Sequence, residues 1–500
     1  MKLRFIALTA AILGAAPTSA APRDWVATHQ TAILAEYRQL LAIPNVATSI
    51  PDIRRNAAHI MVMMANRGLS PRLLEGDAAD VPPAIYGDWR VPGAKRTLVL
   101  YAHYDGQPVT PEEWKSTPPF TPALYTDRID RGGRPIALTG SGAVDANWRI
   151  YGRASSDDKL GVMAILSAVD ALKAAGKRPS FNLKIFFEGE EEAGSPHLAA
   201  LLDKHRDTLK SDGWVIIDGP AHPSGLPQVV LGVRGVVGVN LTVYGPLRPL
   251  HSGHYGNWAP NPAMMLSQLL ASMKDTDGKV LVEGWYDDVV PLTAAERAAV
   301  AAVPPPDAEL KRDLGLARNE GGARLLAEAI QQPSLNVGGL RSVDVGDKAR
   351  NIVPATAAAY IDLRLVKGND HQRQVAKLVR HIERQGYTVL DHEPSVEERL
   401  RFPRIATVRA GSGYNAERTS FDAPLAKSVV AAVKGNGPAV VLPTLGGSLP
   451  LYLLREHLGV DSVTLSLANH DNNQHAEDEN LRLGNLWEAI AIAEAVMQMR

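Results

Sequence analysis

The 500-residue sequence contains no cysteine. This absence excludes disulfide bonds, catalysis by a thiolate, and any metal site with sulfur ligands. A metal site in this chain would therefore have to be built from histidine, aspartate and glutamate. Stability would have to come from the hydrophobic core, from bound metals or from contacts between subunits.

The sequence also lacks an excess of charge of either sign. It has 53 basic and 54 acidic residues, which gives a formal net charge of -1. Nothing in this balance indicates nucleic acid or an anionic membrane as a partner. The hydrophobic content of 45% and the charged content of 21% are typical of a soluble globular protein. This length corresponds to about two to four domains.

Long apolar runs are missing as well, apart from one at the N-terminus. Lys2 and Arg4 precede an apolar run from Phe5 to Ala16, and small residues follow up to Ala20. The run is too short to span a bilayer, and Pro17 would break a continuing helix. This pattern predicts a secretory signal peptide over residues 1–20, cleaved near Ala20, and a periplasmic or secreted mature protein.

Strand and helix patterns alternate along the first half of the chain. Apolar runs typical of buried strands are Thr97–Tyr101, Leu183–Phe187 and Trp214–Ile217. Patterns typical of helices are Ile33–Leu41, Ile53–Met64 and Leu160–Leu172. Such alternation predicts an α/β fold with a mostly parallel sheet flanked by helices.

The pattern changes after Pro220 and returns near the C-terminus. Val229–Tyr244 and Ala357–Leu365 have the texture of antiparallel strands, and they alternate with helical patterns at Pro262–Met273 and Gln372–Arg384. The final part again resembles the first half, with patterns at Leu425–Val433, Ser462–Ala468 and Leu486–Met499. We therefore expect an α/β domain formed by residues 21–228 and 414–500, with a smaller α+β domain inserted between them at 229–413. The proline-rich segment Val290–Arg318 is expected to be a surface excursion.

Histidine and acidic residues stand where the predicted strands end. His103 and Asp105 follow the first strand, Glu188–Glu192 follow the second, and Asp218 follows the third. His475 lies just beyond the strand at Ser462–Ala468. In an open α/β sheet, ligands bind beyond the carboxyl ends of the strands, so these side chains are expected to share one site.

Each of these motifs also has a purely structural interpretation. His103 could be a satisfied histidine at a strand end, and the acidic run could be a solvated loop. Asp157 and Asp158 precede a predicted helix, so either could be its N-cap instead of a bridging metal ligand. Crowded carboxylates repel one another, however, and a pair of metal ions would relieve that repulsion. Oxygen and nitrogen ligands without sulfur suit zinc, cobalt or manganese.

The ordered set of motifs resembles the M20 metallopeptidases, and within them the carnosinase-like dipeptidase branch. The motifs are YAHYDGQPV (Tyr101–Val109), YGRASSDDK (Tyr151–Lys159), EGEEEAGS (Glu188–Ser195), Asp218, HSG (His251–Gly253), GGS (Gly446–Ser448) and His475. The resemblance covers nearly the whole mature chain. It implies a zinc-peptidase-like catalytic domain with an inserted lid and dimerisation domain.

The resemblance also implies a role for each matching residue. It makes His103 and Asp218 ligands of one zinc ion, Glu192 and His475 ligands of the other, and Asp157 the bridge between the two ions. It makes Glu191 the general base and Asp105 the residue that orients His103. The activity it implies is hydrolysis of the amide bond of a dipeptide or small peptide, with zinc replaceable by cobalt or manganese.

The remaining motifs imply substrate contacts and a partner subunit. By the resemblance, His251 would reach the active site of the second subunit of a homodimer and stabilise the oxyanion. Asn351 and Arg364 would hold the substrate carboxylate, and Gly447 and Ser448 would contact the same end of the substrate.

Two departures and two alternatives accompany this hypothesis. The family's GRG reads Gly152-Arg153-Ala154 here, so the turn is expected to differ slightly because alanine resists positive φ. The stretch near Arg128–Trp148 is longer than usual and is expected to be a surface loop next to the site. A deacylase of N-acyl amino acids would share the same metal centre, and a non-catalytic binding protein could retain the fold.

Overall fold

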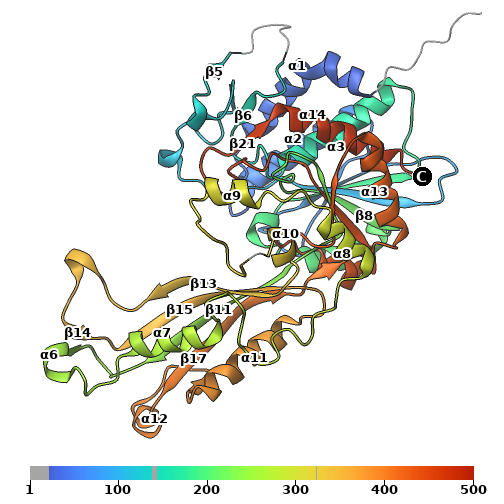
Figure 1. Cartoon of the computed structure of the whole chain (residues 1–500). Helices are drawn as coiled ribbons and strands as arrows, with labels where there is room; N and C mark the ends of the chain where they lie inside the picture. Colours follow the sequence, from blue (N-terminus) through green and yellow to red (C-terminus); the bar gives the residue numbers. More distant parts are fainter. Residues whose placement is uncertain (1–21, 138–143, 323) are drawn as a thin grey trace, which may run out of the picture.

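The computed structural model describes residues 22–137, 144–322 and 324–500. The predicted signal peptide lies outside these residues. The chain forms a rounded α/β domain and an elongated inserted domain that projects from it (Figure 1). Among the described residues, no helix combines the length and apolar character needed to cross a bilayer.

An eight-stranded sheet forms the centre of the α/β domain. Its strands, in spatial order, are β1 (Arg72–Leu74), β2 (Ala84–Trp89), β7 (Asn182–Glu188), β3 (Thr97–His103), β8 (Gly213–Ile217), β20 (Ser462–Ser466), β9 (Gln228–Val230) and β19 (Val440–Leu442). The four central strands β7, β3, β8 and β20 run parallel to their neighbours in this group. Antiparallel pairs occur only towards the two edges. The predicted fold class is confirmed.

Helices cover both faces of this sheet. Successive side chains of each strand point to opposite faces, and apolar residues on both faces are buried under helices. In β3, Leu98 and Leu100 join the core on one face, whereas Val99 and Tyr101 join the core on the other. The first face carries α1 (Pro22–Leu41), α2 (Ile50–Asn66), α3 (Lys159–Ala174), α13 (Pro424–Asn436) and α14 (Leu483–Met497). The second carries α4 (Leu198–Lys204) and the turn η5 (Leu454–Leu458).

The inserted domain is built on a five-stranded sheet. Its spatial order is β13 (Ser334–Arg341), β15 (Thr356–Leu365), β11 (Gly235–Tyr244), β17 (Ile405–Tyr414) and β16 (Thr388–Leu390). All neighbouring pairs are antiparallel except β16 with β17. The helices α7 (Pro262–Met273) and α11 (His371–Arg384) pack on one face of this sheet and form a second core. Along the chain, this sheet begins at Gly235 and ends at Tyr414.

The expectation for Val290–Arg318 was wrong in one respect. This segment contains α8 (Ala294–Ala301) and α9 (Asp307–Asp313), and α8 returns to the α/β domain. Val300 and Val303, each 7% exposed, pack there against Val440 and Leu442 near β19. The helix begins with a capping box formed by Thr293 and Glu296, which is readable in the sequence as T-x-x-E. Its alanine-rich body concealed this, because only two bulky residues mark its buried side.

The longer stretch near Arg128–Trp148, which was expected to be a surface loop, contributes the edge strand β5 (Pro135–Ile136) to a small four-stranded sheet. That sheet has the order β21 (Asn480–Arg482), β6 (Arg149–Tyr151), β4 (Ala123–Tyr125) and β5. Arg128 pairs with Asp130 in the stretch itself and with Asp471 across the chain. Most described residues of the stretch are exposed or half-buried, and residues 138–143 lie outside the described part.

Candidate active site

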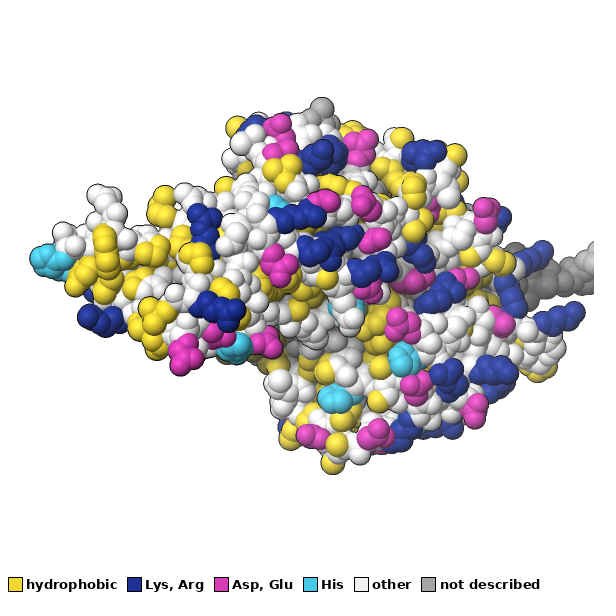
Figure 2. Space-filling model, turned by 90° about the horizontal axis from the view of Figure 1, so that it is seen from below, with side chains coloured by type: hydrophobic (Ala, Val, Ile, Leu, Met, Phe, Trp, Pro, Cys, Tyr) yellow, Lys and Arg dark blue, Asp and Glu magenta, His cyan; other side chains and the backbone are white. Residues whose placement is uncertain are grey.

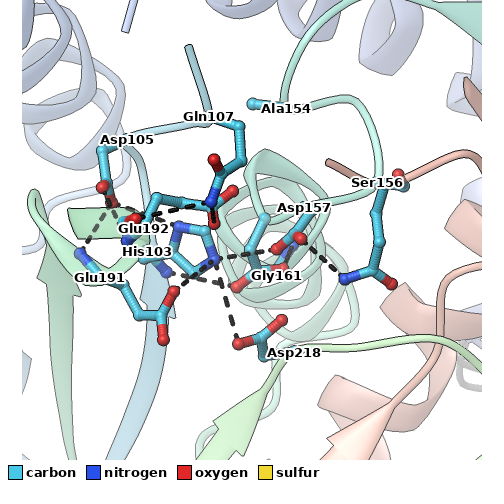
Figure 3. Close-up of polar contacts among 12 residues, drawn as sticks. His103, Asp105, Gln107, Ala154, Ser156, Asp157, Gly161, Glu191, Glu192 and Asp218 are labelled. Carbon is cyan, nitrogen blue, oxygen red and sulfur yellow. Dashed lines mark hydrogen bonds and ion pairs between the residues drawn. The ribbon is translucent and has the colours of Figure 1, made fainter. Parts of the chain in front are cut away.

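The predicted ligands meet at the carboxyl end of the large sheet. The strands β7, β3 and β8 are neighbours. The short helix η3 (Glu191–Ala193) follows β7, His103 ends β3, and Asp218 follows β8. His475 enters from the loop after β20. Figure 3 shows the carboxyl groups of Asp157, Glu191 and Asp218 directed towards the His103 ring. We call His103, Asp157, Glu191, Glu192, Asp218 and His475 the acid–histidine cluster.

Asp157 lies between the two histidines. Its Oδ1 is 3.0 Å from His103 Nε2, and its Oδ2 is 3.1 Å from His475 Nε2. Each oxygen of one carboxylate thus faces a different histidine. A carboxylate in this position can link two metal ions, one on each side.

Asp158 is the N-cap of α3, which is one of the two roles that the sequence left open for this aspartate pair. Its Oδ1 accepts a hydrogen bond from the Gly161 N–H and caps α3, and its Oδ2 accepts one from the His103 N–H. The peptide bond between Asp157 and Asp158 is cis. The cap interpretation is therefore met by Asp158, whereas Asp157 lies between the two histidines.

Two groups of side chains could each hold a divalent ion. Ligand atoms within 4.8 Å of one another occur in the group His103, Asp158 and Asp218, and in the group Asp157, Glu192 and His475. Nitrogen and carboxylate oxygen donors without sulfur fit zinc, cobalt or manganese. The first group is wholly buried, whereas the His475 side chain in the second is 55% exposed.

Asp105 contacts both His103 and the backbone of the turn that carries Glu191 and Glu192. Its Oδ1 is 3.3 Å from His103 Nδ1, on the ring edge opposite Asp157. The same carboxylate accepts hydrogen bonds from the backbone N–H groups of Glu191 and Glu192, at 3.2 and 3.0 Å. One buried side chain therefore orients the His103 ring and sets the turn that carries two further acids.

Three residues that contact the acid–histidine cluster or its loops were not predicted from the sequence. Gln107 donates to Glu192 at 2.7 Å, and Gln474 donates to Asp157 at 2.8 Å. Glu479 is fully buried and accepts from the N–H groups of Ala154, Ser156 and Asp157, from the Ser156 hydroxyl and from Arg153. Glu479 thus fixes the loop that presents Asp157. Only the proximity of Glu479 to His475 in the chain could have suggested its importance.

The acid–histidine cluster contains four carboxyl groups and two imidazoles, so its ionisable groups favour a negative charge. Burial, followed by the charge of Asp157, raises the pKa of Glu192 to about 8 and that of Asp218 to about 6. Burial likewise raises the pKa of Glu191 well above its ordinary value. Burial alone would lower the pKa of His103, but its contacts with Asp105 and Asp157 hold it well above the usual range. Bound cations would relieve this crowding of carboxylates.

A cleft of about 650 Å³ opens beside the cluster. It is lined from the α/β domain by cluster residues, Gln107, Gln474 and the chain from Leu445 to Leu449, and from the inserted domain by Val236, Arg364 and Tyr414. Arg364 Nη1 donates to the Ser448 hydroxyl at 2.9 Å. The structure therefore brings Arg364, Gly447 and Ser448 into the cleft beside the cluster. Tyr414 was not singled out from the sequence.

His251 and Asn351 do not join the cleft within one chain. His251 begins the short helix α6 (Ser252–Tyr255), and Asn351 precedes β14 (Ile352–Val353). Both lie at the far end of the inserted domain, which we call the tip (Figure 1). There the His251 side chain is exposed, accepts from the Gly253 N–H and lies 4.5 Å from the ring of His254. Its predicted role would require a second subunit.

Comparison with known proteins identifies the family. The model of peptidase family M20/M25/M40 matches residues 99–499, which include the whole acid–histidine cluster. The chain belongs to this peptidase family. It is accordingly a metal-dependent peptide hydrolase of the M20 type, related to the carnosinase-like dipeptidases.

Similar M20 proteins cover nearly the full chain. The Cys-Gly metallodipeptidase dug1 of Schizosaccharomyces pombe is 27% identical over 434 residues, covering 86% of this chain and 85% of that protein. The human Beta-Ala-His dipeptidase is 25% identical over 494 residues, covering 95% and 88%. Among solved structures, the M20 family metallo-carboxypeptidase Sso-CP2 from Sulfolobus solfataricus has a TM-score of 0.75 at 28% identity, covering 93% of this chain and 98% of its own.

Ala154, which stands where the M20 pattern has a glycine, adopts a left-handed backbone conformation. Ala154 has a φ of 62°, a region that alanine adopts only at a cost. The N–H of Ala154 donates to Glu479 at 2.9 Å, and its methyl group is buried. Alanine therefore adopts the positive φ for which glycine is the usual residue.

Proposed function

We propose that this M20 peptidase is a dinuclear zinc dipeptidase, with cobalt or manganese as possible substitutes. The observation that carries the proposal is the position of Asp157, whose two oxygens each face a different histidine. Two adjacent ions need such a bridging carboxylate, together with further ligands on each side. The relatives named as metallodipeptidases support dipeptides as the substrate class.

Each ion would be held by residues from different segments. His103 and Asp218 would hold one ion, Glu192 and His475 the other, and Asp157 both. When bound, such ions activate a water molecule and polarise the carbonyl of the amide. Asp105 would keep Nε2 of His103 directed at its ion, because it interacts with the opposite ring nitrogen.

Glu191 is the best-placed general base. Its carboxylate lines the cleft 3.9 Å from His103 Nε2. Within the described part of the chain it has no side-chain hydrogen-bond donor of the kind that Gln107 supplies to Glu192. It would take a proton from the attacking water and deliver it to the amine nitrogen that leaves. Asp105 sets its position through the Glu191 N–H.

The far side of the cleft would bind the C-terminal end of the substrate. Arg364 is the only arginine or lysine among the described residues that line it. A guanidinium suits a carboxylate, and the Ser448 hydroxyl and the Gly447 backbone would complete this contact.

A homodimer would complete the site by bringing the partner's tip to it. In this arrangement, His251 would stabilise the oxyanion of the other subunit, and Asn351 would contact its substrate. Hydrophobic side chains gather along the inserted domain, at the left of Figure 2. The large hydrophobic residues exposed in the inserted domain include Leu247, Tyr255, Trp258, Met264, Val337, Leu340, Val343, Val345 and Tyr360. Apolar surface of this kind marks an interaction site.

Sedimentation of the wild type and Trp258→Glu tests the dimer. Trp258 is 79% exposed, so the substitution should preserve the fold while weakening a dimer formed through this surface. A wild type that sediments as a monomer at assay concentrations would contradict the proposal.

We also propose export, with cleavage near Ala20 and a periplasmic or secreted mature protein. The support is the N-terminal pattern of basic, apolar and small residues. N-terminal sequencing of the protein recovered from its native host tests this. A mature chain that begins at Met1 or Lys2 would contradict it.

The decisive experiment is an activity panel on metal-free protein with zinc, cobalt or manganese added back. We expect metal-dependent cleavage of dipeptides, with two ions bound per chain by elemental analysis. Cleavage of N-acyl amino acids alone would instead indicate a deacylase with the same metal centre. Metal binding without turnover of any substrate in the panel would contradict both activities and favour a binding protein.

A further inference from the structure

One face of the inserted sheet packs against α7 and α11 and forms the core of the inserted domain. Near the α/β domain, the opposite face of this sheet lines the cleft. Side chains alternate along a strand, and in β11 and β15 the residues Val237 and Leu363 belong to the core packed under α7 and α11. Their neighbours Val236 and Arg364 must therefore point to the opposite face. Both line the cleft.

Three strands place their cleft residues in one row. Val236 of β11 pairs with Arg364 of β15 on one side and with Tyr414 of β17 on the other. Side chains of directly paired residues lie on the same face of a sheet, close to one another. The row therefore runs from a guanidinium, across a valine, to an aromatic ring.

The Tyr414 ring is held in place from the side of the α/β domain. It stacks on Tyr452, with ring centroids 5.1 Å apart and an angle of 12° between the planes. Ser448, which accepts a hydrogen bond from Arg364, lines the same cleft as Tyr414. Leu445 and Leu449 line the same cleft. We call Val236, Tyr414, Leu445 and Leu449 the apolar wall.

A dipeptide would be held at two points in this cleft. Its single carboxylate would pair with Arg364, and its amide bond must reach the acid–histidine cluster. The C-terminal residue then spans the region between these two points, and its side chain meets the row beside Arg364. Burial of an apolar side chain against such a wall is favourable, whereas a glycine there would leave the wall uncovered.

We propose that the apolar wall, and Tyr414 above all, selects dipeptides whose C-terminal residue has a large apolar or aromatic side chain. This inference rests on the proposed dipeptidase activity and on the carboxylate contact of Arg364. Tyr414 is a specificity residue in this scheme: it contacts the substrate side chain and takes no part in proton transfer.

The test compares kcat/KM for Ala-Phe, Ala-Leu, Ala-Gly and Ala-Asp, in wild type, Tyr414→Ala and Tyr414→Phe. We expect the wild type to favour Ala-Phe and Ala-Leu over Ala-Gly by roughly 10- to 100-fold. In Tyr414→Ala this ratio should fall by about tenfold or more, whereas Tyr414→Phe, which keeps the ring, should retain it. The pair Phe-Gly and Ala-Gly serves as the control, because its members differ only at the N-terminal residue. Their ratio should change less than about twofold in either variant, since the wall faces the other residue.

Each outcome bears on a different claim. A wild type that cuts dipeptides without this preference, or a Tyr414→Ala variant with an unaltered Ala-Phe to Ala-Gly ratio, overturns the inference and leaves the dipeptidase proposal intact. Better cleavage of Ala-Phe by Tyr414→Ala would also overturn it, because the ring would then obstruct the pocket. A wild type that cuts no dipeptide with any metal overturns the dipeptidase proposal itself.

Discussion

The acid–histidine cluster and the tip of the inserted domain both carry residues of the predicted active site, but they are built in opposite ways. In the cluster, His103 is fully buried, and its two ring nitrogens face Asp105 and Asp157. At the tip, the His251 side chain is exposed and contacts its own turn and the neighbouring His254. The first is organised before any partner arrives, and the second gains its proposed function only from another chain.

This difference separates metal binding from turnover. Preorganised ligands hold an ion without rearrangement, so a single chain should bind metal. Oxyanion stabilisation requires a donor aimed at the reacting carbonyl, and the tip cannot provide it within the same chain. We therefore expect metal content and activity to respond differently to changes in the two regions.

Loss of the general base should have the largest effect. Glu191→Gln keeps the shape of the side chain but removes the proton acceptor, so kcat should fall by roughly 100- to 10,000-fold. Elemental analysis should show metal content equal to that of the wild type, because Glu191 is not a proposed ligand. A variant with normal turnover would refute the base assignment.

Removal of the tip histidine should have the next largest effect. His251→Ala should lower kcat by roughly 100- to 1,000-fold without loss of metal. Co-expression with Glu191→Gln gives a sharper test, because a mixed dimer contains one site with both Glu191 and the partner's His251. Random pairing should then restore about a quarter of wild-type activity, since half the dimers are mixed and each has one intact site. No recovery on mixing would show that His251 does not act across subunits.

The two proposed metal positions should differ in how readily they release their ions. The His475 side chain is 55% exposed, whereas that of His103 is 0% exposed. A chelator should therefore remove the ion at Glu192 and His475 first, with the second ion leaving at least about tenfold more slowly. His475→Ala should bind one ion fewer than the wild type. A single release phase, with both ions lost together, would contradict this asymmetry.

The turn at Ala154 should show the smallest effect. Ala154→Gly removes a left-handed cost of about 1–2 kcal/mol, but it also loses a buried methyl group worth about 0.8 kcal/mol and adds freedom to the unfolded chain. These contributions nearly cancel, so the free energy of unfolding should change by less than about 1 kcal/mol. Urea denaturation measures this. A loss much larger than that would mean that the methyl group has a packing role beyond its area.

The sequence predicted those site residues whose position follows from the sheet. His103, Asp218 and the acids after Phe187 follow strands that are neighbours, so the rule for strand ends brings them together. Gln474 and Glu479 escaped prediction because their partners, Asp157 and its loop, lie more than 300 residues away. Tyr414 escaped for a related reason, since its place in the cleft depends on the strand register of the inserted sheet.

The order in which the chain is synthesised has a consequence for when the site can exist. β20 lies between β8 and β9 in the large sheet, yet it follows both of them, and the entire inserted domain, in the chain. Until β20 and the loop that contains His475 have been made, the sheet has a gap and the second proposed metal position lacks one of its proposed ligands. Domains usually fold as units during synthesis, but this one must wait for its last segment. A nascent or truncated chain would thus be unable to assemble the complete centre, and the hydrolase would become competent only when its synthesis was nearly finished.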